Sequence, residues 1–415
     1  GVTGTVWAGG GPRDVAVVVN SNSQISREIG RYYQQVRGIP DRNICFINCP
    51  DDEVVTWQIC EKQIREPIRR FLNLPGIGDR IDYIVLTKGV PLAADYVDGI
   101  LAGSVDDYYS VTSVLLNIDQ PIVDVTGPGG VPDGRPDNAA CYALPYGPTT
   151  WMTYGFVAPQ TAWSHTLFDS NVPGDVYDIN KRIRLVSRLD GYTLEQIKAS
   201  IDRAANPAID GVFVLDRNNW TFGEYGKANT RLGNTATSAY DYLTRRGFDV
   251  RFDMGQQFIH EIRGVMGYFS WSYHDDQYTF SSYLSNVFVP GSIADTYWSY
   301  SGRTFNDPGP GDRPPLIADL FACGLCGAGA YVSEPQIGTA TYANILFDRY
   351  TKGYNMAESF YAACTLGMWK TTIIGDPLTL AAGILREPLW RFLIVVTLGK
   401  FGRYAVLVVA VQAAG

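Results

Sequence analysis

The stretch DVAVVVNSNS, residues 14–23, decides the fold, because an almost continuous apolar run ends there in small polar residues. An apolar run without polar alternation is typical of a strand that is buried on both faces of a sheet. Apolar side chains then recur at helical spacing from Ile25 to Val36, and Gly38 stands where a helix C-cap is expected. The stretch therefore predicts a strand followed by a helix, the first unit of an α/β sheet.

The same strand and helix pattern repeats along the chain. Strands are predicted at NICFINC (43–49) and DYIVLTKG (82–89), with an amphipathic helix over 56–72 between them. Alternating strands and helices indicate a mainly parallel sheet with right-handed crossovers, arranged either as two lobes of one sheet or as two similar sheets. The later predicted elements lie in RIRLVSRLDG, TLEQIKASIDRAA, DGVFVLD, 236–246, FDVRFDM, VMGYFSW, 315–324 and GAGAYVSEP.

Composition divides the chain into three parts. The first, 1–180, is an N-terminal α/β lobe that includes a loop-rich excursion over about 100–180, rich in Gly and Pro. The second, 181–382, is a C-terminal α/β lobe that carries the candidate site. The third, 383–415, is an apolar C-terminal arm.

The arm is far more apolar than the rest of the chain. Arg391, Lys400 and Arg403 interrupt it, so no run reaches the roughly 18 residues expected of a membrane-spanning helix. An apolar segment of this length has to be covered, either by protein or by a membrane surface. We therefore expect a homo-oligomer, or another protein bound over residues 385–415, with a membrane surface as the alternative.

Charge, the first residues and the cysteines restrict the class of protein further. A net charge of −8 and a pI near 5.0 argue against a nucleic-acid partner, which requires a basic face. The first residues show no signal peptide and no initiating Met, as in an exported protein whose leader has been removed. Seven cysteines allow at most three bridges. Cys45 and Cys49, on one strand, would lie about 13 Å apart, too far to bridge each other.

Polar side chains gather at the ends of the predicted strands. In a parallel α/β sheet, ligands bind beyond the carboxyl ends of the strands. The candidate binding residues are accordingly Asn20, Lys88, Asp216, Asp275 and Glu334.

The stretch GVMGYFSWSYHDD, residues 264–276, contains His274, one of three histidines in the chain. His274 and the two aspartates after it would ligate a cation if Asp106 or Asp107 supplied a further carboxylate. Neighbouring residues alone make a poor cage, because Ca²⁺ takes six or more oxygen ligands. We therefore expect no metal or cofactor, with a calcium ion as the alternative. The competing structural interpretation is a solvent-facing loop histidine.

Over roughly residues 12–380 the chain carries, in this order, the motifs VVVNSNS, YIVLTKGVPL, VSRLDG, GYFSW, GSIADTYWSYSGRTF, LIADL, YNMAESFY and IIGDPL. It resembles an uncharacterised family of bacterial, often exported proteins, which is more distantly similar to gingipain-type cysteine peptidases. The resemblance implies a caspase-like, gingipain-like α/β fold, a mainly parallel sheet layered with helices and an irregular loop-rich insertion. It also implies an extracytoplasmic or cell-surface location.

Gingipain-like enzymes carry a catalytic His at one strand tip and a catalytic Cys at the tip of the next strand. The first position maps onto YFSWSYHDD, where Trp271 occupies the aligned position and His274 follows three residues later. The second maps onto IADTYWSYSGRTF, which lacks Cys and offers Ser299 as the nearest nucleophile. Since a serine hydroxyl needs a well-placed base, an active Cys–His peptidase is not expected. The leading hypothesis is a non-catalytic, degenerate relative with a structural or self-assembly role. The alternative is a hydrolase that uses His274 with Ser299 or a bound cation.

Overall fold

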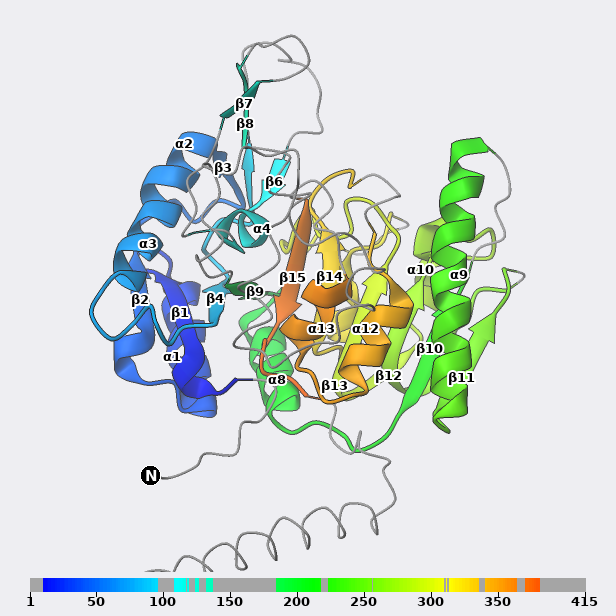
Figure 1. Cartoon of the computed structure of the whole chain (residues 1–415). Coiled ribbons are helices and arrows are strands. Elements are labelled where there is room, and N and C mark those ends of the chain that lie inside the picture. The colour runs from blue at the N-terminus through cyan, green and yellow to red at the C-terminus, as the bar shows by residue number, and fades with distance from the viewer. Residues whose placement is uncertain are drawn as a thin grey trace, which may run out of the picture.

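The structure, a computed structural model, has at its centre a ten-stranded sheet with the order β11-β10-β12-β13-β14-β15-β9-β4-β1-β2. Neighbouring strands are parallel except for the antiparallel pair β14 and β15. Helices cover both faces of this sheet (Figure 1). The predicted fold class, a mainly parallel α/β sheet layered with helices, is confirmed, and the two halves form one sheet. The structure describes residues 10–95, 108–116, 118, 124–126, 132–136, 184–217, 223–255, 257–309, 311, 313–335, 340–363 and 370–380.

The first half of the sheet begins as the opening stretch predicts. All six residues of β1 are buried, and α1 ends at Gly38 in the left-handed conformation with a φ of 65°. The helix expected over 56–72 is built from α2, a π-helical turn (Cys60–Arg65) and α3. The elements are β1 (Val15–Asn20), α1 (Gln24–Arg37), β2 (Ile44–Ile47), β3 (Val54–Thr56), α2 (Trp57–Ile59), α3 (Glu66–Leu72), β4 (Tyr83–Thr87), β5 (Ala93–Asp95), β6 (Tyr108–Ser110), α4 (Val111–Leu116), β7 (Asp124–Thr126), β8 (Pro132–Pro136) and β9 (Leu185–Leu189).

The second half contains the predicted strands and several elements that were not predicted. Thr193 caps α8, since its hydroxyl accepts from the backbone N–H of Gln196 at 3.2 Å. The elements α12 and α13 had no predicted counterpart, whereas the motif IIGDPL, which indicates the close of a strand or turn, begins within β15. The elements are α8 (Leu194–Ala205), β10 (Val212–Asp216), α9 (Gly223–Arg245), β11 (Asp249–Asp253), β12 (Arg263–Ser270), the 3₁₀ turn η4 (Ser272–His274), α10 (Phe280–Tyr283), β13 (Val287–Thr296), α11 (Ile317–Ala322), β14 (Gly327–Tyr331), α12 (Ala343–Tyr350), α13 (Met356–Ala363) and β15 (Thr371–Gly375).

Apolar cores lie on both faces of the sheet. One face packs against α1, α8, α9, α12 and α13, through side chains such as Ile29 and Phe360. The other face packs against α3 in the first half and α11 in the second, through side chains such as Ile68 and Leu320. Because both faces are covered, central strands such as β1 and β4 are buried along their whole length and lack polar alternation, whereas the edge strand β11 alternates.

Two buried acid groups join the two halves of the molecule. Glu358 on α13 accepts a hydrogen bond from the hydroxyl of Tyr83 on β4, at 3.0 Å. Asp376, just after β15, accepts from the hydroxyl of Tyr33 on α1 at 2.8 Å and pairs with Arg37. Both carboxyl groups are fully buried, so these contacts hold the halves together without solvent screening.

Some predictions fall outside the described residues. These are the carboxylates of Asp106 and Asp107, two of the cysteines, most of the loop-rich excursion and the arm 383–415. Among the helices that are described, none is long and apolar enough to cross a membrane.

Candidate functional site

Asn20 ends β1 and ties three strand ends together. Its amide nitrogen donates to the carbonyl oxygens of Gly89 at 2.7 Å and Cys49 at 3.1 Å. Its amide oxygen accepts from the backbone N–H groups of Asn22 and Cys49. The side chain is fully buried, and these bonds use the hydrogen-bonding capacity of its amide. Asn20 is therefore a structural clasp between the ends of β1, β2 and β4.

Lys88 is held in the same way at the end of β4. Its ammonium group donates to carbonyl oxygens of Gly191 at 2.9 Å and Phe305 at 2.7 Å, and to Asp190 at 3.3 Å. Asp190 also receives two hydrogen bonds from Arg188, the shorter at 2.6 Å, and both side chains are buried. All three ammonium protons are thus engaged, and Lys88 links the two halves of the sheet rather than facing a ligand.

His274 lies in η4, directly after β12, and aromatic rings surround it. Its ring centroid is 4.9 Å from that of Trp298, which follows β13, and 6.1 Å from that of buried Trp271. Burial lowers the pKa of His274 below its usual 6.5, and the nearby charge of Glu334, which follows β14, acts in the opposite direction. The imidazole is therefore mostly neutral at neutral pH, with a carboxylate nearby and indole rings against it.

Ser299 follows Trp298 directly, so the structure brings the segment of Ser299 to the ring of His274. Ser272 and Tyr300, one in each of these two loops, have left-handed backbones with φ of 52° and 62°. A left-handed non-glycine residue costs of order 1–3 kcal/mol and is found most often at functional sites. Together these features mark the ends of β12 and β13 as the candidate functional site, here called the His274 loops (271–276 and 297–301).

Asp216 ends β10 beneath these loops. Its side chain is 1% exposed, and its Oδ2 accepts from the hydroxyl of Ser270, the last residue of β12, at 2.8 Å. Burial raises the pKa of Asp216 well above its usual range, and the charges of Asp275 and Asp253 raise it further. Asp216 and Asp253 thus form an acidic cluster with Asp275, which belongs to the His274 loops.

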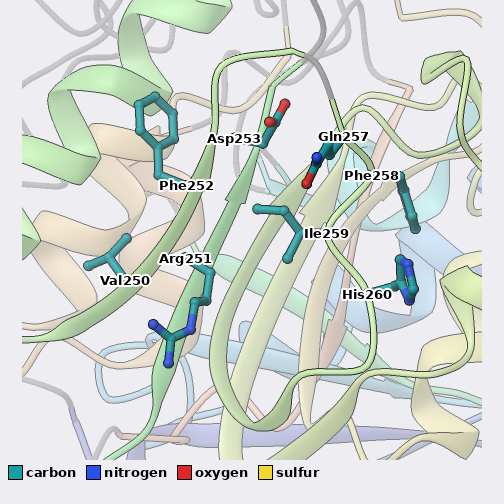
Figure 2. A pocket seen from close by; sticks show the side chains of 8 residues that line it. All are labelled: Val250, Arg251, Phe252, Asp253, Gln257, Phe258, Ile259 and His260. Carbon is teal, nitrogen blue, oxygen red and sulfur yellow. The ribbon is translucent and has the colours of Figure 1, made fainter.

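An open cavity of about 480 Å³ lies beside this cluster, between the edge strand β11 and the segment that follows it. Figure 2 shows Asp253 near Gln257 at the end of the strand, with Val250 and Phe252 directed away from the following segment. The cavity is lined by Val250, Arg251, Phe252, Asp253, Gln257, Phe258, Ile259 and His260. None of the predicted site residues lines it.

The thiols of the five cysteines that the structure describes are poorly suited to act as nucleophiles for this site. Burial raises the pKa of three cysteines of the first half to about 12 and that of Cys323 to about 11, and Cys326 is shifted in the same direction. A thiol with such a pKa is protonated at neutral pH and is a poor nucleophile. The described cysteines are also unbridged, as expected for Cys45 and Cys49: Cys45, Cys49, Cys60, Cys323 and Cys326.

No group of three or more His, Cys, Asp or Glu side chains is arranged to hold a metal ion in the part of the chain that the structure describes. The predicted partners Asp106 and Asp107 lie outside that part, so the calcium alternative stays a prediction.

Sequence reasoning missed Ser270, Trp298 and the pair of Arg188 and Asp190. The pair had a readable signal, because residues two apart at the end of a strand lie on one face of the sheet. For Ser270 and Trp298 the signal is weaker, since each depends on which strands become neighbours.

Comparisons with known proteins add a distant likeness only. No protein-family model and no curated protein matches the chain. One similar solved structure is the complex of the pro- and mature domains of Porphyromonas gingivalis RgpB, with 10% identity over 88% of this chain and 79% of that chain, and a TM-score of 0.39. Another is described as a protease, with 9% identity over 89% of this chain and 78% of that chain, and a TM-score of 0.41. The fold assignment rests on the topology of the sheet itself.

Proposed function

We propose that this chain is a non-catalytic protein that binds its partner or ligand with the His274 loops. The observation that carries the proposal is the position of the imidazole, which packs against the rings of Trp271 and Trp298. The raised pKa of the five described cysteines supports it, because a protonated thiol is a poor nucleophile for a cysteine peptidase.

A second candidate is a serine hydrolase, in which His274 would take the proton of the Ser299 hydroxyl and Glu334 would stabilise the imidazolium. The lowered pKa of His274 and the left-handed backbones of the two loops favour it. This candidate requires an imidazole nitrogen and the serine oxygen within hydrogen-bonding distance when substrate is bound.

A fluorophosphonate probe separates the two candidates, because it reacts with activated serines and leaves ordinary hydroxyls unmodified. We expect no adduct on the peptide that contains Ser299, measured by mass spectrometry of the intact protein and of its digest. The Ser299→Ala variant and the Ser281→Ala variant, which removes an exposed hydroxyl on α10, serve as controls. Labelling that is lost in Ser299→Ala and in His274→Gln but kept in Ser281→Ala would establish the hydrolase instead.

The proposal extends to self-association outside the cytoplasm, through residues 385–415. The apolar composition of this segment supports it, because an apolar segment in water has to be covered. We expect the full chain to form oligomers in solution and a chain truncated after Ile384 to be monomeric, as measured by light scattering without detergent. Equal association states for the two chains would refute this part of the proposal and leave the His274 loops untouched.

A further inference from the structure

The turn that carries His274 is anchored from below by one short chain of hydrogen bonds. The hydroxyl of Ser270 donates to Oδ2 of Asp216 at 2.8 Å and accepts from the backbone N–H of Ser272 at 2.9 Å. Asp216 is on β10 and Ser270 on β12, so the chain runs from one strand through its neighbour into η4.

The anchored residue is also the strained one. Ser272 has a φ of 52°, a conformation that costs an ordinary residue roughly 1–2 kcal/mol. The turn is closed above it by the N–H of His274, which donates to the carbonyl of Trp271 at 3.1 Å. A residue with a left-handed backbone persists only where its surroundings hold it. The bond from Ser270 to the N–H of Ser272 supplies such a restraint.

Asp216 is buried, but only one of its two carboxyl oxygens has a hydrogen-bond partner. Its Oδ1 has no partner within hydrogen-bonding geometry, although the backbone N–H of Ile259 lies near enough to favour the charged form. The charged groups that face it are Asp253 from β11 and Asp275 from the His274 loops, both of the same sign. Tyr268, two residues before Ser270 on β12, is buried beside Asp216. A buried carboxyl with one of its two oxygens outside hydrogen-bonding geometry costs stability, so Asp216 calls for a local explanation at this point.

We propose that Asp216 is a positioning residue for His274, acting through Ser270 on the left-handed turn at Ser272. The turn in turn fixes where the imidazole lies relative to the indole rings of Trp271 and Trp298. The inference rests on the proposed function, because it concerns the same loops, but it predicts a property of the imidazole rather than a reaction.

The test follows the titration of the His274 imidazole by NMR in the full chain. The wild-type signal is assigned by its loss in His274→Asn, and the emission of the indole rings is recorded on the same samples. We expect Asp216→Asn to keep the wild-type titration, because its amide oxygen can accept the same bond from Ser270. We expect Asp216→Ala and Ser270→Ala to move the pKa of His274 toward 6.5 and to shift the tryptophan emission to the red.

Asp249→Ala is the matched control, because Asp249 is an exposed acid on the neighbouring strand β11. An unchanged titration in a folded Asp216→Ala or Ser270→Ala variant would overturn the inference. So would an Asp216→Asn variant that behaves like Asp216→Ala, because the carboxyl would then act through its charge and not through this bond. If Asp216→Ala does not fold, the titrations of His274 in Ser270→Ala and Asp216→Asn still test the inference. Fluorophosphonate labelling is independent of all these outcomes, so failure here is distinguishable from failure of the proposed function.

Discussion

The sharpest test of the fold concerns Glu358, the buried acid on α13. Its side chain accepts from the hydroxyl of Tyr83 at 3.0 Å and from the backbone N–H of Asn355 at 2.9 Å, which caps the helix. Burial, the largest cause, raises the pKa of Glu358 from 4.5 to about 7; the two hydrogen bonds act against it and the charge of Asp82 adds to it. The carboxyl therefore holds its proton in the folded protein at a pH where the unfolded chain has lost it.

The sign follows from proton binding in the two states. Between pH 4.5 and about pH 7 the folded state binds more protons at Glu358 than the unfolded state, so stability falls as the pH rises. The difference between the two pKa values corresponds to about 3 kcal/mol of unfolding free energy, at about 1.4 kcal/mol for each pKa unit. Below pH 4.5 and above about pH 7 this group contributes no further slope.

We expect the Glu358→Gln variant to lose this contribution, because a glutamine stays neutral while it can still accept the capping bond. Urea denaturation at pH 5, 6, 7 and 8 gives the unfolding free energy of both proteins. The difference between the two unfolding free energies should change by about 2.5 kcal/mol between pH 5 and pH 8, in favour of the variant at high pH. Glu195→Gln, an exposed acid in the first turn of α8, is the matched control and should leave the slope unchanged. Parallel pH curves for the wild type and Glu358→Gln would refute the reasoning.

Three further outcomes follow from buried contacts described above. Asn20→Ala should lower the unfolding free energy by about 2–4 kcal/mol in urea denaturation, because the backbone partners of its amide are left unsatisfied; a loss below about 0.5 kcal/mol would contradict the clasp. Gly329→Ala should lower the melting temperature, since the added Cβ would lie 2.4 Å from Oδ2 of Asp295; an unchanged melting temperature would show that β14 can shift. Finally, the thiols of five cysteines should react with Ellman's reagent only after denaturation, because their pKa is raised: Cys45, Cys49, Cys60, Cys323 and Cys326. Mass spectrometry maps the modified sites, and rapid modification of the native protein at these cysteines would contradict the raised pKa.

Local pattern was enough to predict the elements that carry strong periodicity. The strand at 14–20 is buried on both faces, and the helix after it ends at Gly38, because these signals depend only on neighbours in sequence. β15 was indicated only through the motif IIGDPL, which is typical of the close of a strand or turn, and its place in the sheet depends on its pairing with β14. The order of the strands in the sheet could not be predicted from local pattern. For the same reason the sequence left open whether the chain forms one sheet or two.

The candidate site was predictable by its place and not by its contacts. His274 and Asp216 fall at strand ends, as the parallel pattern requires. His274 lies in the loop after β12, and Asp216 ends the neighbouring strand β10. Asn20 and Lys88 fall at strand ends too, but their side chains bind backbone carbonyls of other segments, such as those of Gly89 and Phe305. Sequence cannot separate these two cases, because a buried amide and a ligand-binding amide have the same local pattern.

The position of β15 has a consequence for how the chain is made. Residues 371–375 are among the last of the described chain, yet they lie inside the sheet, between β14 and β9. Until the ribosome has released them, β14 and β9 each keep an unpaired edge, and unpaired edges are where chains aggregate. Strand pairing between residues far apart in sequence is slow, so we expect the two halves of the sheet to join late in folding. A chain that stops short of Thr371 is therefore expected to be lost to aggregation or degradation, and not to persist as a folded N-terminal half.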